Sequence, residues 1–316
     1  MTSVATSSPA QPESRAGRYA PSPSGDLHLG NLRTALLAWL FARSEGREFL
    51  LRIEDLDRVQ PGAADRQLAD LAAIGLDWDG PVVRQSDRFD SYAAVIEHLT
   101  AQGRTYECFC TRKEVREAAS APHAPPGAYP GTCRDLTEAD RTKRRKSRPP
   151  AIRLRADVPE FTVTDVLSGD YTGVVDDFAL RRNDGTPAYN VAVVVDDGAQ
   201  HIGQVVRGDD LLSSSPRQAY LATLLGLPVP QYAHVPLALN SSGVRLAKRD
   251  GAVTLAQLAD VGWTAQRVLG LLATSAGLAE PTERVSAAGL LDRFRPAELP
   301  TFPWIVTPDQ LQAVAG

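Results

Sequence analysis

The sequence predicts an α/β protein with a doubly wound parallel sheet that is interrupted by an inserted subdomain. Three observations support this class. Short strand patterns alternate with helical patterns in residues 18–102, an apolar run flanked by turn residues lies at 187–195, and residues 103–184 have irregular periodicity and are rich in Cys, Pro, Arg and Lys. Strands that alternate with helices favour a parallel sheet, because each helix carries the chain back to start the next strand at the same end.

The composition is that of an ordinary globular protein. The chain has 316 residues, of which 43% are hydrophobic and 23% are charged. A net charge of −4 gives no global attraction to nucleic acid, so any RNA contact requires a local basic surface. No stretch approaches the roughly 18 apolar residues of a membrane span. Residues 1–17 are rich in Ser, Ala and Pro, and we expect a disordered N-terminal extension of a cytoplasmic protein.

The first strand, loop and helix are predicted in residues 18–31, RYAPSPSGDLHLGN. A helical pattern begins near Leu29, directly after an irregular loop rich in Pro and Ser. Free backbone N–H groups and the positive end of the helix dipole meet at such a junction, which suits a phosphate-bearing ligand. His28 can donate a hydrogen bond to a phosphate oxygen, and Gly30 allows close approach to the backbone. The alternative is that His28 is an ordinary surface histidine.

The next strand is predicted at residues 48–53, EFLLRI, and a helix is expected at 92–99. The strand delivers Glu54, Asp55 and Asp57 to the carboxyl edge of the sheet, where ligands collect in α/β folds. Asp55 and Asp57 either serve that ligand or cap the following helix. We expect Glu54 to be functional, because a substrate ammonium group needs a buried or half-buried carboxylate partner.

The inserted subdomain contains all three cysteines of the chain, Cys108, Cys110 and Cys133. Their close spacing favours a metal site in a reduced compartment over a disulfide framework. Zinc prefers four ligands in a tetrahedron, with pairs contributed by two chain segments. The pairs are Cys108 with Cys110 and a second pair that contains Cys133, and the residues leave the fourth ligand open between Tyr129 and His123. Three buried thiols without a metal are the alternative.

Residues 141–148, RTKRRKSR, form the most basic run in the chain. The run is either a solvated face or a surface that contacts an RNA backbone. Strands are expected around it at 151–155, 161–166 and 176–182.

The second half of the sheet is predicted to resume at residues 187–195, where VAVVV indicates a strand buried on both faces, with Tyr189 at its start. Residues 205–210, VVRGDD, place Arg207 at another strand end. Arg207 either faces a ligand or forms a structural salt bridge with Asp209 or Asp210. A helix is expected at 216–226, a strand at 235–239, and helices over 254–316.

A second cationic loop, RLAKRDG, occupies residues 245–251. Together with the segment around His28 it resembles the paired signatures of class I aminoacyl-tRNA synthetases, written H-I-G-H and K-M-S-K-S. The resemblance is to the glutamyl branch, and it rests on five motifs in the same order: RYAPSPSGDLHLG, LLRIEDLD, PAYNVAVVVDD, HIGQVVRGDDLL and RLAKRDGA.

That resemblance implies a Rossmann-like parallel sheet with an inserted zinc-binding subdomain and a short C-terminal helical region. The catalytic domain would comprise residues 18–102 and 185–240, the zinc-binding and RNA-contact subdomain residues 103–184, and the second signature with the helical region residues 241–316. A full glutamyl-tRNA synthetase carries a large anticodon-binding domain beyond this point, and we expect none here.

The resemblance also implies an ATP-dependent ligase and assigns its site residues. Glutamate would be bound by Arg18, Ser22, Glu54, Tyr189 and Arg207. ATP, with Mg²⁺ on its phosphates, would be bound by His28, Gly30, Asn31, Arg245 and Lys248, of which His28 and Lys248 are the catalytic pair. The second signature departs from its common form, with Arg245 in place of a lysine and Ala247 in place of a serine. Which arginine faces which carboxylate of glutamate stays open.

The C-x-C…Y-x3-C arrangement and the short C-terminal region resemble the glutamyl-queuosine tRNA(Asp) synthetase family. This resemblance implies Tyr129 as the fourth ligand of one zinc ion. It implies a monomer that activates L-glutamate without needing tRNA and transfers it to queuosine in the anticodon loop of tRNA(Asp), with no membrane partner. The alternatives are a minimal glutamyl-tRNA synthetase that charges tRNA(Glu) and a non-catalytic zinc- and RNA-binding paralogue.

Overall fold

The computed structural model describes residues 15–111, 113–115, 128–246 and 253–311. In this part of the chain the largest sheet has seven strands in the order β3-β2-β1-β9-β10-β6-β7. Every described neighbour pair in it is parallel except β6 with β7, which confirms the predicted α/β class. The strands are β1 (Ala16–Tyr19), β2 (Phe49–Ile53), β3 (Val83–Arg84), β6 (Glu160–Asp165), β7 (Gly169–Val174), β9 (Ile202–Gly208) and β10 (Gln231–Val235).

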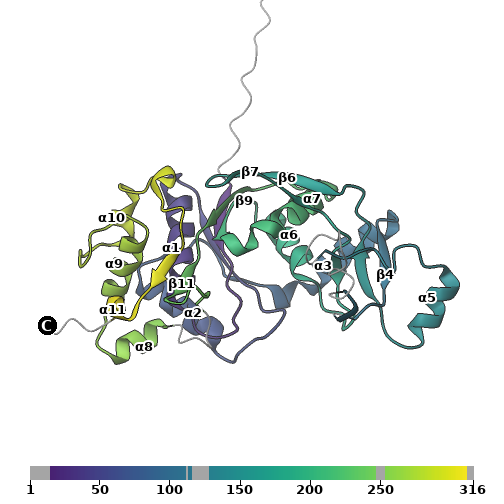
Figure 1. Ribbon diagram of the computed structural model, residues 1–316, viewed down its shortest axis with the longest axis horizontal. Helices are drawn as coiled ribbons and strands as arrows, with labels where there is room; N and C mark the ends of the chain where they lie inside the picture. Colours follow the sequence, from purple (N-terminus) through teal and green to yellow (C-terminus); the bar gives the residue numbers. More distant parts are fainter. Residues whose placement is uncertain (1–14, 112, 116–127, 247–252, 312–316) are drawn as a thin grey trace, which may run out of the picture.

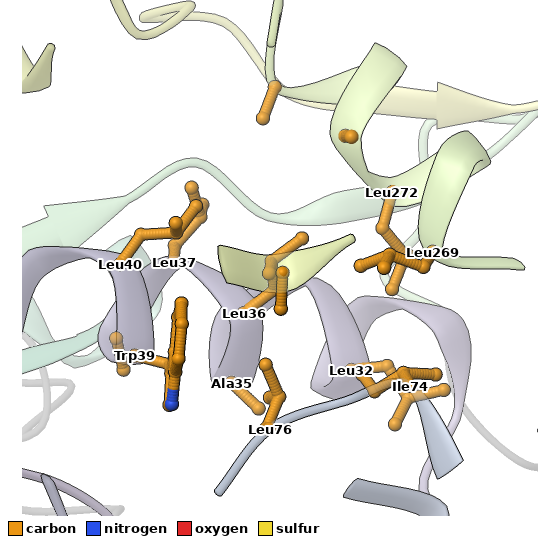
Figure 2. Packing of buried hydrophobic residues seen from close by; sticks show 14 of the residues in the cluster. Leu32, Ala35, Leu36, Leu37, Trp39, Leu40, Ile74, Leu76, Leu269 and Leu272 are labelled. Atoms are coloured by element: carbon orange, nitrogen blue, oxygen red, sulfur yellow. The ribbon is translucent and has the colours of Figure 1, made fainter. Parts of the chain in front are cut away.

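The main core surrounds helix α1 (Leu29–Ser44), which begins where the sequence predicts a helix start. The helix is buried on nearly all sides, as expected for a helix with leucine or alanine on every face. Figure 2 shows its leucines between Leu269 and Leu272 of α9 (Ala265–Ser275) on one side and Ile74 and Leu76 on the other. The C-terminal helices therefore cover the face of α1 that points away from the sheet, as Figure 1 also shows.

The C-terminal region contains one strand that the sequence analysis did not predict, because only helices were expected there. Strand β12 (Trp304–Val306) pairs in parallel with β11 (Ala238–Asn240). In the chain, β11 comes directly after β10, which belongs to the main sheet. Arg33 of α1 adds a polar link, because its buried guanidinium donates to the backbone oxygen of Pro236 at 2.7 Å and to Ser275 Oγ at 3.0 Å. The C-terminal region is thus held by strand pairing to β11, in a separate two-stranded sheet, and by Arg33 to α1.

The prediction of a strand at residues 187–195 is wrong, because this segment forms helix α6 (Tyr189–Ala199). Five consecutive apolar residues suit a buried strand and a buried helix equally, since neither periodicity shows in so short a run. The helix packs against α3 (Phe89–Ala101) and α7 (Ser215–Leu224), and all residues from Val191 to Asp197 are buried. This burial outweighs the weak helix propensity of valine.

The strands of the predicted insertion, residues 103–184, belong to two different sheets. β4 (Thr105–Cys108), β5 (Ala151–Leu154) and β8 (Ala179–Arg181) form a separate antiparallel sheet, whereas β6 and β7 extend the main one. Figure 1 shows β4 and helix α5 (Glu138–Arg145) at the end of the molecule opposite the C-terminal helices.

The remaining elements are α2 (Ala63–Ala73), α8 (Leu255–Asp260), α10 (Ala287–Leu291), α11 (Pro308–Leu311) and the 3-10 turns Gln85–Arg88, Asp209–Ser214 and Pro296–Glu298. Within the described ranges, no helix has both the length and the apolar character that a bilayer crossing requires.

Candidate functional site

A cleft of about 840 Å³ opens at the carboxyl edge of the main sheet. It is lined by residues from β1 and β9, by the loop that begins at Glu54 after β2, by the start of α1 and by the start of α6. The fold brings together here all the residues predicted to bind glutamate or ATP that the structure describes: Arg18, Ser22, His28, Gly30, Asn31, Glu54, Tyr189, Arg207 and Arg245.

His28 is the N-cap residue of α1. Its Nδ1 accepts a hydrogen bond from the backbone N–H of Asn31 at 3.2 Å, and Asn31 Oδ1 accepts from the backbone N–H of His28 at 3.3 Å. Because Nδ1 is an acceptor, the proton of the neutral imidazole is on Nε2. A Cβ atom on Gly30 would lie 3.0 Å from His28 Cε1, so the glycine also makes room for the imidazole ring itself.

The segment that follows the second signature lies beside His28. The backbone N–H of Leu29 donates to the carbonyl of Val253 at 3.0 Å, and His28 and Thr254 form an isolated β-bridge. Arg245, which precedes the signature's centre, forms an ion pair with Asp210 at the cleft. Lys248, the predicted catalytic lysine, lies outside the described residues.

A network of buried charges joins Arg18 and Glu54, which line the cleft, to Arg52 and Asp197, which do not. Arg52 of β2 donates to Asp197 Oδ1 at 2.8 Å and to Glu54 Oε1 at 3.3 Å, and Arg18 Nε donates to the same oxygen of Asp197 at 3.4 Å. Burial raises the pKa of Glu54 despite the opposing charges of Arg52 and Arg18. The sequence analysis did not single out Arg52 or Asp197, although both belong to the quoted motifs LLRIEDLD and PAYNVAVVVDD.

Arg207 lies at the end of β9 with 5% of its surface exposed. It donates to Gln218 Oε1 at 2.8 Å, to Ser215 Oγ at 2.7 Å and to His234 Nε2 at 3.1 Å. These partners are all uncharged acceptors, and among the described residues Arg207 forms no ion pair with Asp209 or Asp210. The salt-bridge alternative for Arg207 is therefore wrong.

The two predicted hydroxyl residues lie at the mouth of the cleft. Tyr189 is the first residue of α6 and is 41% exposed, and Ser22 is exposed in the loop after β1.

The capping alternative for the two aspartates after β2 is wrong, since the N-cap of α2 is Gly62. Asp55 instead accepts hydrogen bonds from the backbone N–H of Ser86 at 2.8 Å and its Oγ at 2.7 Å. Asp57 pairs with Arg182 at 3.1 Å. These contacts fix the loop after β2 at the edge of the cleft.

The three cysteines converge in the inserted subdomain, with their Sγ atoms within 4.8 Å of one another. Cys110 Sγ lies 3.6 Å from Cys133 Sγ, and Tyr129 Oη lies 3.3 Å from Cys108 Sγ and 3.7 Å from Cys110 Sγ. Zinc bonds of about 2.3 Å to sulfur place two sulfur atoms of a tetrahedron roughly 3.8 Å apart, so the donor set is compatible with zinc. His123, the other candidate ligand, lies outside the described residues.

Two contacts of Tyr129 would stabilise a negatively charged oxygen, whereas its burial opposes one. The backbone N–H of Cys133 donates to Tyr129 Oη at 2.9 Å, and the Arg153 guanidinium lies 3.7 Å from the centre of the ring. Burial raises the pKa values of the Tyr129 phenol and the Cys110 thiol, so these groups need a bound cation to ionise. Zinc would supply that charge.

The basic run forms most of helix α5 and the turn after it, and none of the helix residues is buried. Arg145 pairs with Glu107 and Glu138, whereas Lys143 and Lys146 are exposed. The helix thus presents a basic face next to the cysteine cluster.

The parallel sheet, the cleft at its carboxyl edge and the paired signatures define a class I aminoacyl-tRNA synthetase. In agreement, residues 16–312 match the family described as tRNA synthetases class I (E and Q), catalytic domain. The chain is therefore an ATP-dependent ligase, of a class that uses Mg²⁺ with ATP.

Similar curated proteins show to which family within class I the chain belongs. The chain is 66% identical to a glutamyl-Q tRNA(Asp) synthetase of Nocardia farcinica over 94% of each chain. It is 54% identical to a protein of the same name in Cutibacterium acnes, over 87% of this chain and 80% of the relative. The chain belongs to the glutamyl-Q tRNA(Asp) synthetase family.

Glutamate–tRNA ligases are more distant relatives. The enzyme of Pelobacter propionicus is 39% identical over 93% of this chain, which spans 64% of that enzyme. Among solved structures, a glutamate tRNA ligase from Elizabethkingia meningosepticum in complex with its amino acid superimposes with a TM-score of 0.80 at 28% identity, covering 95% of this chain and 68% of that one.

Proposed function

We propose that this protein activates L-glutamate with ATP as glutamyl-adenylate, without needing tRNA, and transfers the glutamyl group to queuosine in the anticodon loop of tRNA(Asp). The observation that carries the proposal is the 66% identity, over 94% of both chains, to a relative named for that reaction. We further propose a cytoplasmic monomer. We keep the domain boundaries given by the sequence analysis with two changes: β1 begins at Ala16, inside the extension expected at residues 1–17, and β6 and β7 of the insertion belong to the main sheet.

Adenylate formation requires a glutamate carboxylate oxygen to attack the α-phosphorus of ATP while pyrophosphate leaves. No protein nucleophile takes part, so catalysis consists of alignment and of neutralising phosphate charge. His28 Nε2–H and the N-terminus of α1, with Gly30 and Asn31, would donate to the phosphates, and the cationic groups of Arg245 and Lys248 would neutralise their charge. Mg²⁺ bound with ATP supplies further positive charge to the phosphates.

Glutamate carries two carboxylates and one ammonium group. Arg18 and Arg207 supply two guanidinium groups for the carboxylates, and Glu54 supplies the carboxylate for the ammonium. Tyr189 and Ser22 add hydroxyl groups. Support comes from the cleft, because all five residues line it and Arg207 has only neutral partners in the described chain.

In this proposal the inserted subdomain contacts RNA. Cys108, Cys110, Cys133 and Tyr129 would hold one zinc ion that fixes the subdomain. Lys143 of α5 and Lys146 directly after it would contact phosphates of the anticodon arm, because such contacts are electrostatic and need no base recognition.

The test is transfer of labelled glutamate from ATP and enzyme to two purified RNAs, queuosine-containing tRNA(Asp) and tRNA(Glu). Mild periodate treatment of a parallel sample blocks free cis-diols and serves as the control. We expect label on the first RNA and its loss after periodate. Label only on tRNA(Glu) would indicate a minimal glutamyl-tRNA synthetase, and failure to form the adenylate would indicate a non-catalytic paralogue.

A further inference from the structure

A buried polar chain lies behind Arg207 and outside the cleft. It consists of Asp165 at the end of β6 and His234 in β10, each 2% exposed, and neither residue lines the cleft. His234 and Arg207 are register partners on neighbouring parallel strands, so their side chains stand on the same face of the sheet.

The hydrogen bonds of Asp165 determine where the His234 proton lies. Asp165 Oδ2 accepts from the backbone N–H of His234 at 2.9 Å and contacts His234 Nδ1 at 2.6 Å. Its other oxygen, Oδ1, accepts from the backbone N–H groups of Leu167 and Ser168 at 3.0 and 2.9 Å. Because all the other partners are donors, the carboxylate is ionised and Nδ1 carries the proton.

The opposite side of the imidazole must then be an acceptor. Arg207 Nε lies 3.1 Å from His234 Nε2, and Ser215 Oγ lies 3.2 Å from it. The N–H at Arg207 Nε can only donate, so Nε2 offers a lone pair and the imidazole is neutral. Burial lowers the pKa of His234 and favours the same neutral form.

We propose that His234 is a positioning residue for Arg207, and that Asp165 fixes the His234 tautomer that can accept from the guanidinium. The inference rests on the proposed function, in which Arg207 binds a carboxylate of glutamate. A carboxylate in place of His234 would orient the guanidinium equally well, but it would also neutralise its charge. A neutral imidazole orients Arg207 and leaves its positive charge for the anionic substrate.

Two substitutions of His234 separate the acceptor from the rest of the side chain. His234→Gln keeps an oxygen that can accept from Arg207, whereas His234→Leu has no acceptor, and both alter the contact with Asp165. The assay is glutamate-dependent ATP–pyrophosphate exchange, with KM measured for glutamate and for ATP. We expect His234→Leu to raise the KM for glutamate roughly 10- to 100-fold, as for a lost hydrogen bond to a charged group. The KM for ATP should stay unchanged, and His234→Gln should lie much closer to the unmodified enzyme.

A double substitution tests the role of the tautomer. In Asp165→Asn, an amide N–H can face Nδ1 and move the imidazole proton to Nε2, where it opposes Arg207. The glutamate KM should rise. Adding His234→Gln should lower it again, because the Gln oxygen accepts whichever group stands at position 165. A purely structural role for the pair predicts instead that the double variant is no better than Asp165→Asn.

His98→Gln is the matched control, since His98 is an exposed histidine of α3 that does not line the cleft. Equal glutamate KM values for His234→Leu, His234→Gln and the unmodified enzyme would overturn the inference and leave the proposed function standing. Absence of exchange in the unmodified enzyme would overturn the proposed function, and the inference with it. If Asp165→Asn does not fold, the comparison of His234→Leu with His234→Gln decides the result.

Discussion

Replacing Gly30 with alanine tests whether the start of α1 is built around the His28 imidazole. Alanine is a better helix former than glycine by about 1 kcal/mol, so helix propensity alone predicts that Gly30→Ala stabilises the protein. The structure predicts the opposite. The new Cβ would lie 3.0 Å from His28 Cε1, 3.1 Å from His28 Nδ1 and 3.2 Å from Ala238 Cβ.

Relief of these contacts requires the imidazole to move. The ring is held by its hydrogen bond from the Asn31 N–H, and the loss of an N-cap costs about 0.5–2 kcal/mol. Overpacking adds about 1–3 kcal/mol. After subtraction of the propensity gain of about 1 kcal/mol, the free energy of unfolding should fall by about 0.5–4 kcal/mol.

Urea denaturation measures the stability change, and exchange kinetics measure its effect on the site. Because we propose that the His28 end of the cleft binds ATP, the KM for ATP should rise more than the KM for glutamate. Ser44→Ala, at the exposed far end of the same helix, is the control. A stabilised Gly30→Ala variant with an unchanged KM for ATP would refute the reasoning.

Three further predictions concern the charged and metal-binding groups. Lys248→Ala should abolish pyrophosphate exchange and leave circular dichroism and the unfolding curve unchanged; undiminished exchange would refute its catalytic assignment. Cys133→Ser should release zinc, measured by atomic absorption, and should weaken transfer to RNA more than glutamate activation, with equal loss of both steps arguing against an RNA-contact role. Burial raises the pKa of Glu54 above its ordinary 4.5, so the carboxylate that would bind the ammonium is lost as the pH falls through that raised value. The glutamate KM should therefore rise on acidification, whereas Glu54→Gln should have a high KM without that pH dependence.

Local patterns were sufficient to predict much of the fold. The helix start at Leu29, the strand that ends at Ile53 and the strand that carries Arg207 were all correct, because turn residues and apolar periodicity mark them clearly. The helix at Tyr189–Ala199 was missed, since its run of valines is apolar on every side and tertiary burial decided its conformation.

The sequence by itself determined which chemical groups the site contains. Motifs identified His28, Glu54, Arg207 and the cysteine cluster, since residue type and spacing limit the chemistry that a segment can perform. Only the tertiary structure decided how these groups are held. The Asp165, His234 and Arg207 chain joins strands far apart in the sequence, and neither the partners of a buried charge nor its tautomer leaves a local pattern. Such contacts depend on strand order and register, which long-range packing decides.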